Sequence, residues 1–155
     1  MRHFALALLL VALGGATVLA KQRHCAVRFH LQANARDSEI FATQMRSQFS
    51  GKPEVIEKTA RISEQDVAAF YPYPANDGSF GVLLQLDEHG KLALDTLSVE
   101  RRGTPLFVFV NGRPLTELQI DRRISDGRIF IPAGLNAADI ELMRKDWRMI
   151  GSRKK

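Results

Sequence analysis

The sequence LFVFVNGRPL at residues 106–115 is the stretch that decides the fold. Its unbroken apolar run, 106–110, is typical of a central strand that is covered on both faces. Asn111-Gly112 follows at once, and this pair readily adopts the positive φ angles of a two-residue hairpin turn. The stretch therefore predicts a buried strand, a tight turn and a second strand that runs through Leu118 and Ile120.

The residues after this hairpin predict one more strand and a final helix. Asp126-Gly127 indicates a turn before a short strand at 128–131, and the break at 132–136 introduces the helix. Apolar residues recur along this helix at spacings of three, four and three, which puts them on one face. We expect this stripe to dock on the sheet: Ile140, Met143, Trp147 and Ile150.

The residues before the hairpin predict a strand and a capped helix. Apolar and polar residues alternate from Phe80 to Leu86, as in a half-buried strand, and 90–101 is expected to be helical. Between the two elements, Asp87-Glu88-His89 resembles an acid–base constellation. The sequence places no nucleophile nearby, so we interpret these residues as the cap of the helix, where acidic groups favour the positive end.

The first half of the chain is less regular. Residues 27–31 alternate as a strand, and 55–61 predicts a weaker one. A helix is expected at 37–49, capped by Asp37 or Ser38, because apolar residues recur there at every fourth position. Its stripe consists of Phe41, Met45 and Phe49.

Residues 63–78 predict a second short helix and a surface loop. Ser63-Glu64-Gln65-Asp66 resembles a capping box that opens a helix through Phe70. Tyr71-Pro72-Tyr73-Pro74 is expected to end this helix as a loop, and 76–78 as a turn. Together the elements predict the α+β class: a single domain at 21–151 with a mainly antiparallel mixed sheet and helices packed chiefly on one face.

The N-terminus has the pattern of a signal peptide at 1–20. Residues 4–20 carry no charge, and Val18 and Ala20 fit the small positions of a cleavage site that would leave Lys21 first. We therefore expect a periplasmic or secreted protein without stable membrane insertion after cleavage. The alternative is an anchor formed by uncleaved residues 4–20.

Composition and charge exclude several classes of protein. A hydrophobic content of 45% with 25% charged residues is ordinary for a globular domain and argues against disorder. The formal charge of +5 is largely due to Arg2 and the basic tail at 152–155, so the body is close to neutral and no nucleic-acid partner is expected. Cys25 is the single cysteine, which excludes an intramolecular disulfide.

The sequence offers no constellation typical of catalysis or metal binding. His24 and His30 would stand about 20 Å apart on a strand, so they are expected at the surface rather than around an ion. Gly78-Ser79-Phe80-Gly81 does not have the spacing of a nucleophile elbow. We therefore expect no catalytic residue, no metal and no cofactor.

Two features are candidates for binding. Tyr71 and Tyr73 would present rings on a stiff loop, or alternatively cover the edge of the core. Arg122 and Arg123 would bind acidic groups, or alternatively form a surface ion-pair cluster with nearby aspartates. The sequence leaves both pairs of alternatives open.

Three segments carry a recognisable order of motifs: GVLLQLDEHGKLAL at 81–94, LFVFVNGRPL at 106–115 and ISDGRIFIPAGLNAADIELM at 124–143. Over residues 80–151 this order resembles the head of the first periplasmic domain of the protein-export membrane proteins SecD and SecDF. The resemblance implies an exported, non-enzymatic binding module with a polypeptide or envelope protein as its partner. A structural or accessory subunit of an envelope complex is the alternative, and a small periplasmic enzyme is a third possibility.

Overall fold

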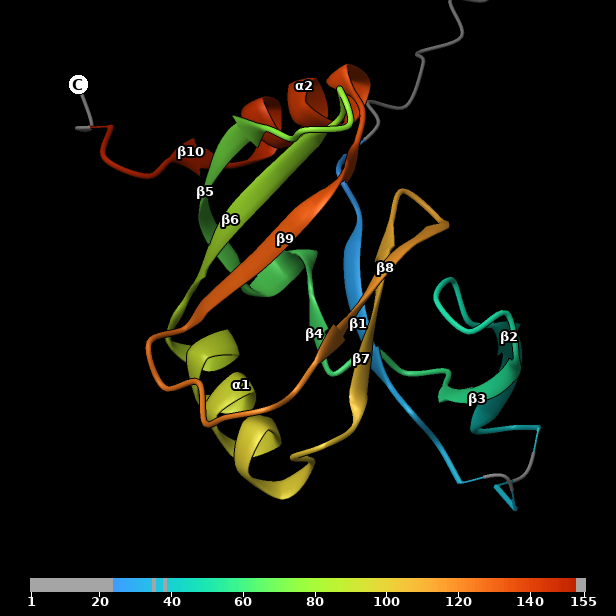
Figure 1. The fold of residues 1–155 in the computed structure, drawn as a ribbon. Coiled ribbons are helices and arrows are strands. Elements are labelled where there is room, and N and C mark those ends of the chain that lie inside the picture. The colour runs from blue at the N-terminus through green and yellow to red at the C-terminus, as the bar shows by residue number, and fades with distance from the viewer. Residues whose placement is uncertain (1–23, 35, 38, 153–155) are drawn as a thin grey trace, which may run out of the picture.

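The computed structural model describes residues 24–34, 36–37 and 39–152 (Figure 1). The expected leader at 1–20, the new N-terminus at Lys21, the cap candidate Ser38 and residues 153–155 of the tail lie outside the described residues. Within the described part, no helix has both the length and the apolar character needed to cross a membrane.

Most strands belong to two four-stranded sheets. The first sheet is antiparallel and has the order β4-β1-β7-β8, made of Ile62–Ser63, Val27–Leu31, Pro105–Val110 and Arg113–Gln119. The second sheet has the order β10-β5-β6-β9, made of Arg148–Met149, Val67–Pro74, Phe80–Leu86 and Arg128–Leu135. Within it β10 pairs parallel to β5 and the other pairs are antiparallel. The structure thus confirms the α+β class and the mainly antiparallel pairing.

The two helices lie at opposite ends of the sheets, α2 at the top and α1 at the bottom of Figure 1. Helix α1 spans Glu88–Glu100, and Asp87 caps it by accepting the backbone N–H of Gly90 at 2.8 Å. Helix α2 spans Ala137–Asp146 and is capped by Asn136. The interpretation of Asp87 as a helix cap is therefore confirmed.

One apolar core joins both sheets and both helices. Strand β7 lies inside the first sheet, and Phe107 and Val108, which point to opposite faces, are both buried. This confirms the prediction of a central strand covered on both sides. The inward side chains of the second sheet and of the helices complete the core, among them Phe70, Val82, Leu84, Leu94, Ile129, Ile131, Ile140 and Met143.

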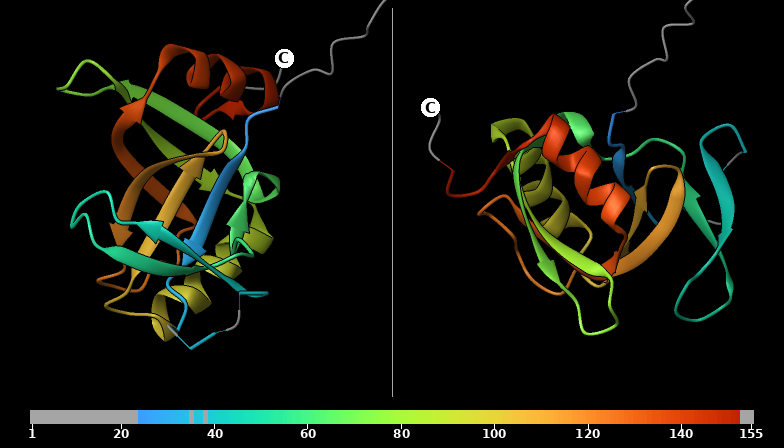
Figure 2. Two further views of the ribbon diagram at one scale, coloured as in Figure 1. Left: turned by 90° about the vertical axis from the view of Figure 1, so that its right-hand side faces the viewer. Right: turned by 90° about the horizontal axis from the view of Figure 1, so that it is seen from above.

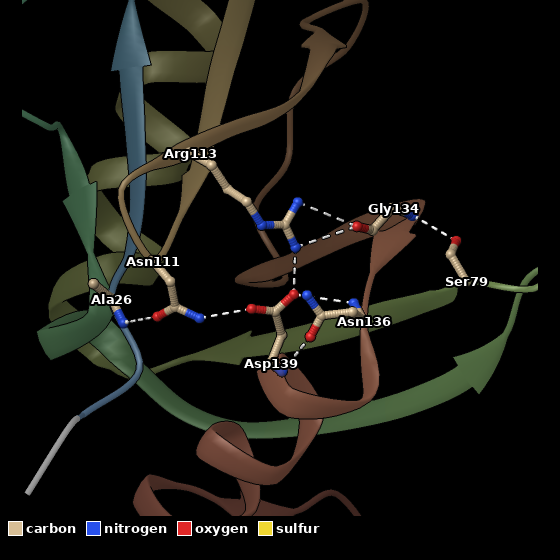
Figure 3. Close-up of polar contacts among 7 residues, drawn as sticks. All are labelled: Ala26, Ser79, Asn111, Arg113, Gly134, Asn136 and Asp139. Carbon is tan, nitrogen blue, oxygen red and sulfur yellow. Dashed lines mark hydrogen bonds and ion pairs between the residues drawn. The ribbon is translucent and has the colours of Figure 1, made fainter.

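The predicted hairpin joins β7 to β8. Asn111 and Gly112 have φ angles of 51° and 81°, the left-handed conformation that this two-residue turn requires. The turn is also tied to its surroundings, because Oδ1 of Asn111 accepts the backbone N–H of Ala26 at 3.0 Å (Figure 3). The tip of the hairpin is therefore held to the start of β1.

A buried carboxylate connects this tip to helix α2. Asp139 accepts hydrogen bonds from the Asn111 side chain at 2.7 Å, from the Arg113 guanidinium and from the backbone N–H of Asn136 at 3.0 Å (Figure 3). In return Asn136 accepts the backbone N–H of Asp139, which completes a capping box. A charge buried to this extent is tolerated only when it is paired and hydrogen-bonded, as here.

The helix predicted at 37–49 is wrong. Strand β2, Ala42–Arg46, pairs antiparallel with β3, Pro53–Glu57, as a separate two-stranded sheet at the side of the molecule (Figures 1 and 2). Gly51, which follows the predicted stripe, has a φ of +66° in the turn of this hairpin rather than ending a helix. The expected stripe is not a buried face, since Phe41 and Phe49 are 71% and 73% exposed.

The interpretation of 63–74 is only partly right. The capping box of Ser63 and Asp66 is present, but its helix is a single turn, η1, at Glu64–Asp66. The chain then enters β5, so Tyr71 to Pro74 is the end of a strand and not a loop. Prolines are tolerated there because β10 pairs with β5 only at Ala69 and Phe70, which leaves the far end of β5 at the sheet edge.

The stripe predicted on the last helix is correct for Ile140 and Met143, which are buried. Helix α2 ends at Asp146, however, and the next residues extend to pair with β5. Trp147 caps the helix and is only partly buried, with its ring edge-on to Phe70 at 6.3 Å. Ile150 lies beyond β10 and is not part of a helical stripe.

Candidate binding face

The outer face of the second sheet carries an exposed row of large apolar side chains. Phe70, Leu84 and Ile129 point into the core, so their neighbours on each strand point out. In the register of the sheet, Tyr71 lies opposite Leu83, and Leu83 lies opposite Phe130. Tyr71 is 49% and Phe130 57% exposed. We call these three residues, Tyr71, Leu83 and Phe130, the aromatic row.

Tyr73 lies beside this row and holds part of it in place. Its ring covers Gly81 on the neighbouring strand, where the absence of a side chain leaves room. The ring stacks on Phe130 with centroids 5.1 Å apart and planes 3° from parallel, and its hydroxyl donates to the carbonyl of Ile131 at 2.6 Å. Burial raises the pKa of Tyr73. Phe130 is therefore exposed but rigidly supported.

The structure brings the two predicted binding candidates to the same side of the molecule. The connection from β8 to β9 forms an open groove with Leu83 of the aromatic row, lined by Leu83, Arg122, Arg123, Ile124, Ser125, Asp126 and Arg128. Tyr71 also adjoins Leu83, by direct pairing across the sheet. Leu83 thus lies between Tyr71 and the two arginines.

The two arginines differ in their contacts. Arg123 makes a two-pronged ion pair with Asp95 of α1, with N–O distances of 2.6 and 2.8 Å. The hydrogen bonds of this pair raise the pKa of Arg123 and lower that of Asp95. Arg122 is exposed and makes no hydrogen bond or ion pair with any residue that the structure describes. Arg122 is therefore the more available of the two.

Three residues of this face were missed by the sequence analysis. Phe130 stands between Ile129 and Ile131, so the alternation along the strand predicts that its side chain points outward. The sequence does not show which residues lie next to Phe130 on the neighbouring strands. Arg128 lies opposite Gln85 and donates to its side-chain oxygen at 3.0 Å. Arg148 is on β10, a strand that the sequence did not predict.

The other clusters of titratable groups have structural partners. Asp66 accepts the backbone N–H of Ser63, and Asp87 caps α1, although both carboxylates approach the His89 ring to within 4.8 Å. Nδ1 of His89 lies 2.7 Å from Asp66, and this hydrogen bond raises the pKa of His89. The two carboxylates therefore have structural roles: Asp66 stabilises the turn at η1 and Asp87 caps α1.

The histidines near the start of the chain bind different partners. His24 lies 2.9 Å from the Asp146 carboxylate, whereas His30 lies 2.8 Å from the carbonyl of Glu57. Burial raises the pKa of Cys25 to about 12, which keeps its thiol protonated near neutral pH. These three residues do not form a common site.

The fold and the outer face define an α+β module with an exposed aromatic sheet face. No family model and no curated protein matches the chain. Three chains of solved structures do match, and two of them, both with a TM-score of 0.55, are of SecDF.

The first structure is described as that of a membrane component SecDF that enhances protein export. It is 16% identical, and the match covers 85% of this chain and 69% of the other. The second shows SecDF in a super-membrane-facing form, at 14% identity over 81% of this chain and 19% of the other. At such identity the likeness shows the fold alone. It confirms the expected resemblance and extends it well beyond residues 80–151.

Proposed function

We propose that this chain is an exported, non-enzymatic binding module of the SecD/SecDF periplasmic-head type that contacts polypeptide through the aromatic row. The proposal rests on one observation: the exposed rings of Tyr71 and Phe130 lie on either side of Leu83 on the outer face of the second sheet. Large aromatic side chains dominate the energy of protein interfaces, and rigid ones lose little entropy on binding.

The proposal also draws on the structural likeness. SecDF is described as enhancing protein export. By analogy, we infer that this chain acts outside the cytoplasm on exported polypeptides that are still extended. Such chains expose apolar side chains, for which an aromatic surface is a suitable partner. The expected leader at 1–20 supplies the route to that compartment.

The test is binding of a reduced, carboxymethylated model polypeptide, which cannot fold, to the purified domain. We expect the double variant Tyr71→Ala, Phe130→Ala to bind at least about ten-fold more weakly, since each ring is a candidate hot spot. A matched control, Leu92→Ala with Val99→Ala, removes two apolar side chains that are 67% and 56% exposed on α1. Equal binding by both double variants would show that the aromatic row is not the contact surface.

A further inference from the structure

Guanidinium groups lie along the aromatic row on the same face of the second sheet. Arg128 is two residues before Phe130 on β9, and Arg148 of β10 lies opposite Ala69, which is two residues before Tyr71 on β5. Residues two apart on a strand point to the same face and stand about 7 Å from each other. A cationic row therefore borders the aromatic row on one side, and Arg122 extends it beside Leu83.

These three guanidiniums are not neutralised within the fold. Arg122, Arg128 and Arg148 are exposed, and none forms an ion pair with a carboxylate in the described ranges. The neighbouring Arg123 is different, since Asp95 neutralises it. Asp126 is the acidic residue of the same groove, and its side chain accepts the backbone N–H of Arg128 at 3.1 Å. The face therefore combines aromatic rings with an excess of positive charge, although the body as a whole is near neutral.

We propose that this face selects acidic segments of extended polypeptide, in which Asp or Glu stands close to large apolar residues. The proposal rests on the function proposed above and specifies its partner. Apolar side chains of the segment lie on Tyr71, Leu83 and Phe130, while its carboxylates reach the guanidiniums of Arg122, Arg128 and Arg148. A guanidinium presents two parallel N–H groups to a carboxylate, which suits this recognition better than a lysine would.

The experiment compares two fluorescent peptides that differ only in charge. One is a twelve-residue peptide of alternating Asp and Phe broken by Ser, and the other has Asn in place of every Asp. We expect the acidic peptide to bind about ten-fold more tightly in anisotropy titrations at low salt, because exposed ion pairs each contribute modestly. The preference should disappear near 1 M salt, where screening acts within about 3 Å.

Two triple variants locate the preference. Arg122→Gln, Arg128→Gln, Arg148→Gln should bind both peptides equally. The control removes the same charge from exposed positions away from the aromatic row, Lys52→Gln, Arg102→Gln, Lys145→Gln, and should keep the preference. If the control loses the preference to the same extent, net charge and not this face is responsible, and the proposal is overturned.

The remaining outcomes separate this inference from the function on which it rests. If the wild type binds both peptides equally, acid selection is wrong while polypeptide binding stands. If it binds neither peptide and no unfolded chain, both proposals fail. If anionic vesicles or an oligonucleotide bind more tightly than the acidic peptide through the same three arginines, the partner is not a polypeptide and the inference is overturned.

Discussion

Replacing Gly81 by alanine tests how the outer face is held together. A Cβ atom at Gly81 would meet Cζ, Cε2 and the hydroxyl oxygen of Tyr73 well inside 3.0 Å, a separation that real Cβ atoms essentially never show. The conflicting atoms are the far end of a side chain, so we expect the ring to swing away while the backbone stays. Tyr73 would then lose its hydrogen bond to Ile131 and its stack on Phe130.

The expected magnitude follows from these losses. A hydrogen bond of this kind contributes about 1 kcal/mol, and an aromatic pair about 0.5–1.5 kcal/mol. Alanine recovers about 0.5–1 kcal/mol because it is less flexible than glycine in the unfolded chain. The free energy of unfolding of Gly81→Ala should therefore fall by about 1 kcal/mol, which lowers the Tm by about 3–5 °C.

The assay is a double-mutant cycle measured by urea denaturation. In a Tyr73→Ala background the conflict is absent, so adding Gly81→Ala should leave stability unchanged or raise it. The chain has two tyrosines, so a Tyr71→Phe background lets ultraviolet titration report Tyr73 alone. There Gly81→Ala should bring the raised pKa of Tyr73 back toward 10.0. Unchanged stability together with an unchanged Tyr73 titration would refute this account of the face.

Three further predictions concern the rest of the fold. In the same urea titration, Gly112→Val should lower the free energy of unfolding by about 1–2 kcal/mol. The cause is backbone strain alone, because φ is +81° and no atom lies within 4 Å of a Cβ placed there. Gly112→Asn should lower the free energy of unfolding by less. Trp147→Ala should cost about 2–3 kcal/mol, below the range for a fully buried ring, and Trp147→Phe should recover much of it by keeping the contact with Phe70. The pKa of His89, measured by NMR titration, should lie above 6.5 and return toward 6.5 in the variant Asp66→Asn. The stability that protonated His89 contributes should therefore be complete below pH 6.5 and lost as pH rises through the folded pKa. A wild-type pKa at or below 6.5 would contradict the hydrogen bond to Asp66.

The elements predicted correctly are those that local chemistry decides. Asn111-Gly112 forms a hairpin turn because the two residues adopt positive φ angles, and Asp87 caps a helix because it accepts a backbone N–H three residues later. Neither feature depends on distant parts of the chain. The predicted helix at 37–49 failed for the opposite reason. A repeat of four in apolar residues suits a helix, but the pairing of Ala42 with Glu57 depends on a partner strand that the repeat does not reveal.

The candidate site was predicted in parts but not as a whole. Tyr71, Tyr73, Arg122 and Arg123 were chosen by residue type. In the structure Tyr71 and the two arginines lie on either side of Leu83, while Tyr73 lies opposite Gly81 and stacks on Phe130. That arrangement depends on the register of three strands, and a slip of one residue would turn every side chain to the other face. Phe130 could be recognised only once this register was known.

The position of β1 has a consequence for how the chain is made. This strand lies between β4 and β7, with Val27 opposite Val110, and β5 pairs with β10 near the other end of the chain. The first sheet is incomplete until β8 has been synthesised, and the second until β10 has been. Pairings across such long separations in sequence form slowly. A ribosome-bound fragment that ends before Pro105 therefore has only the short strand β4 to pair with β1 and lacks β7, its longer partner. Under the export proposed above, this delay would keep the chain unfolded while it crosses the membrane.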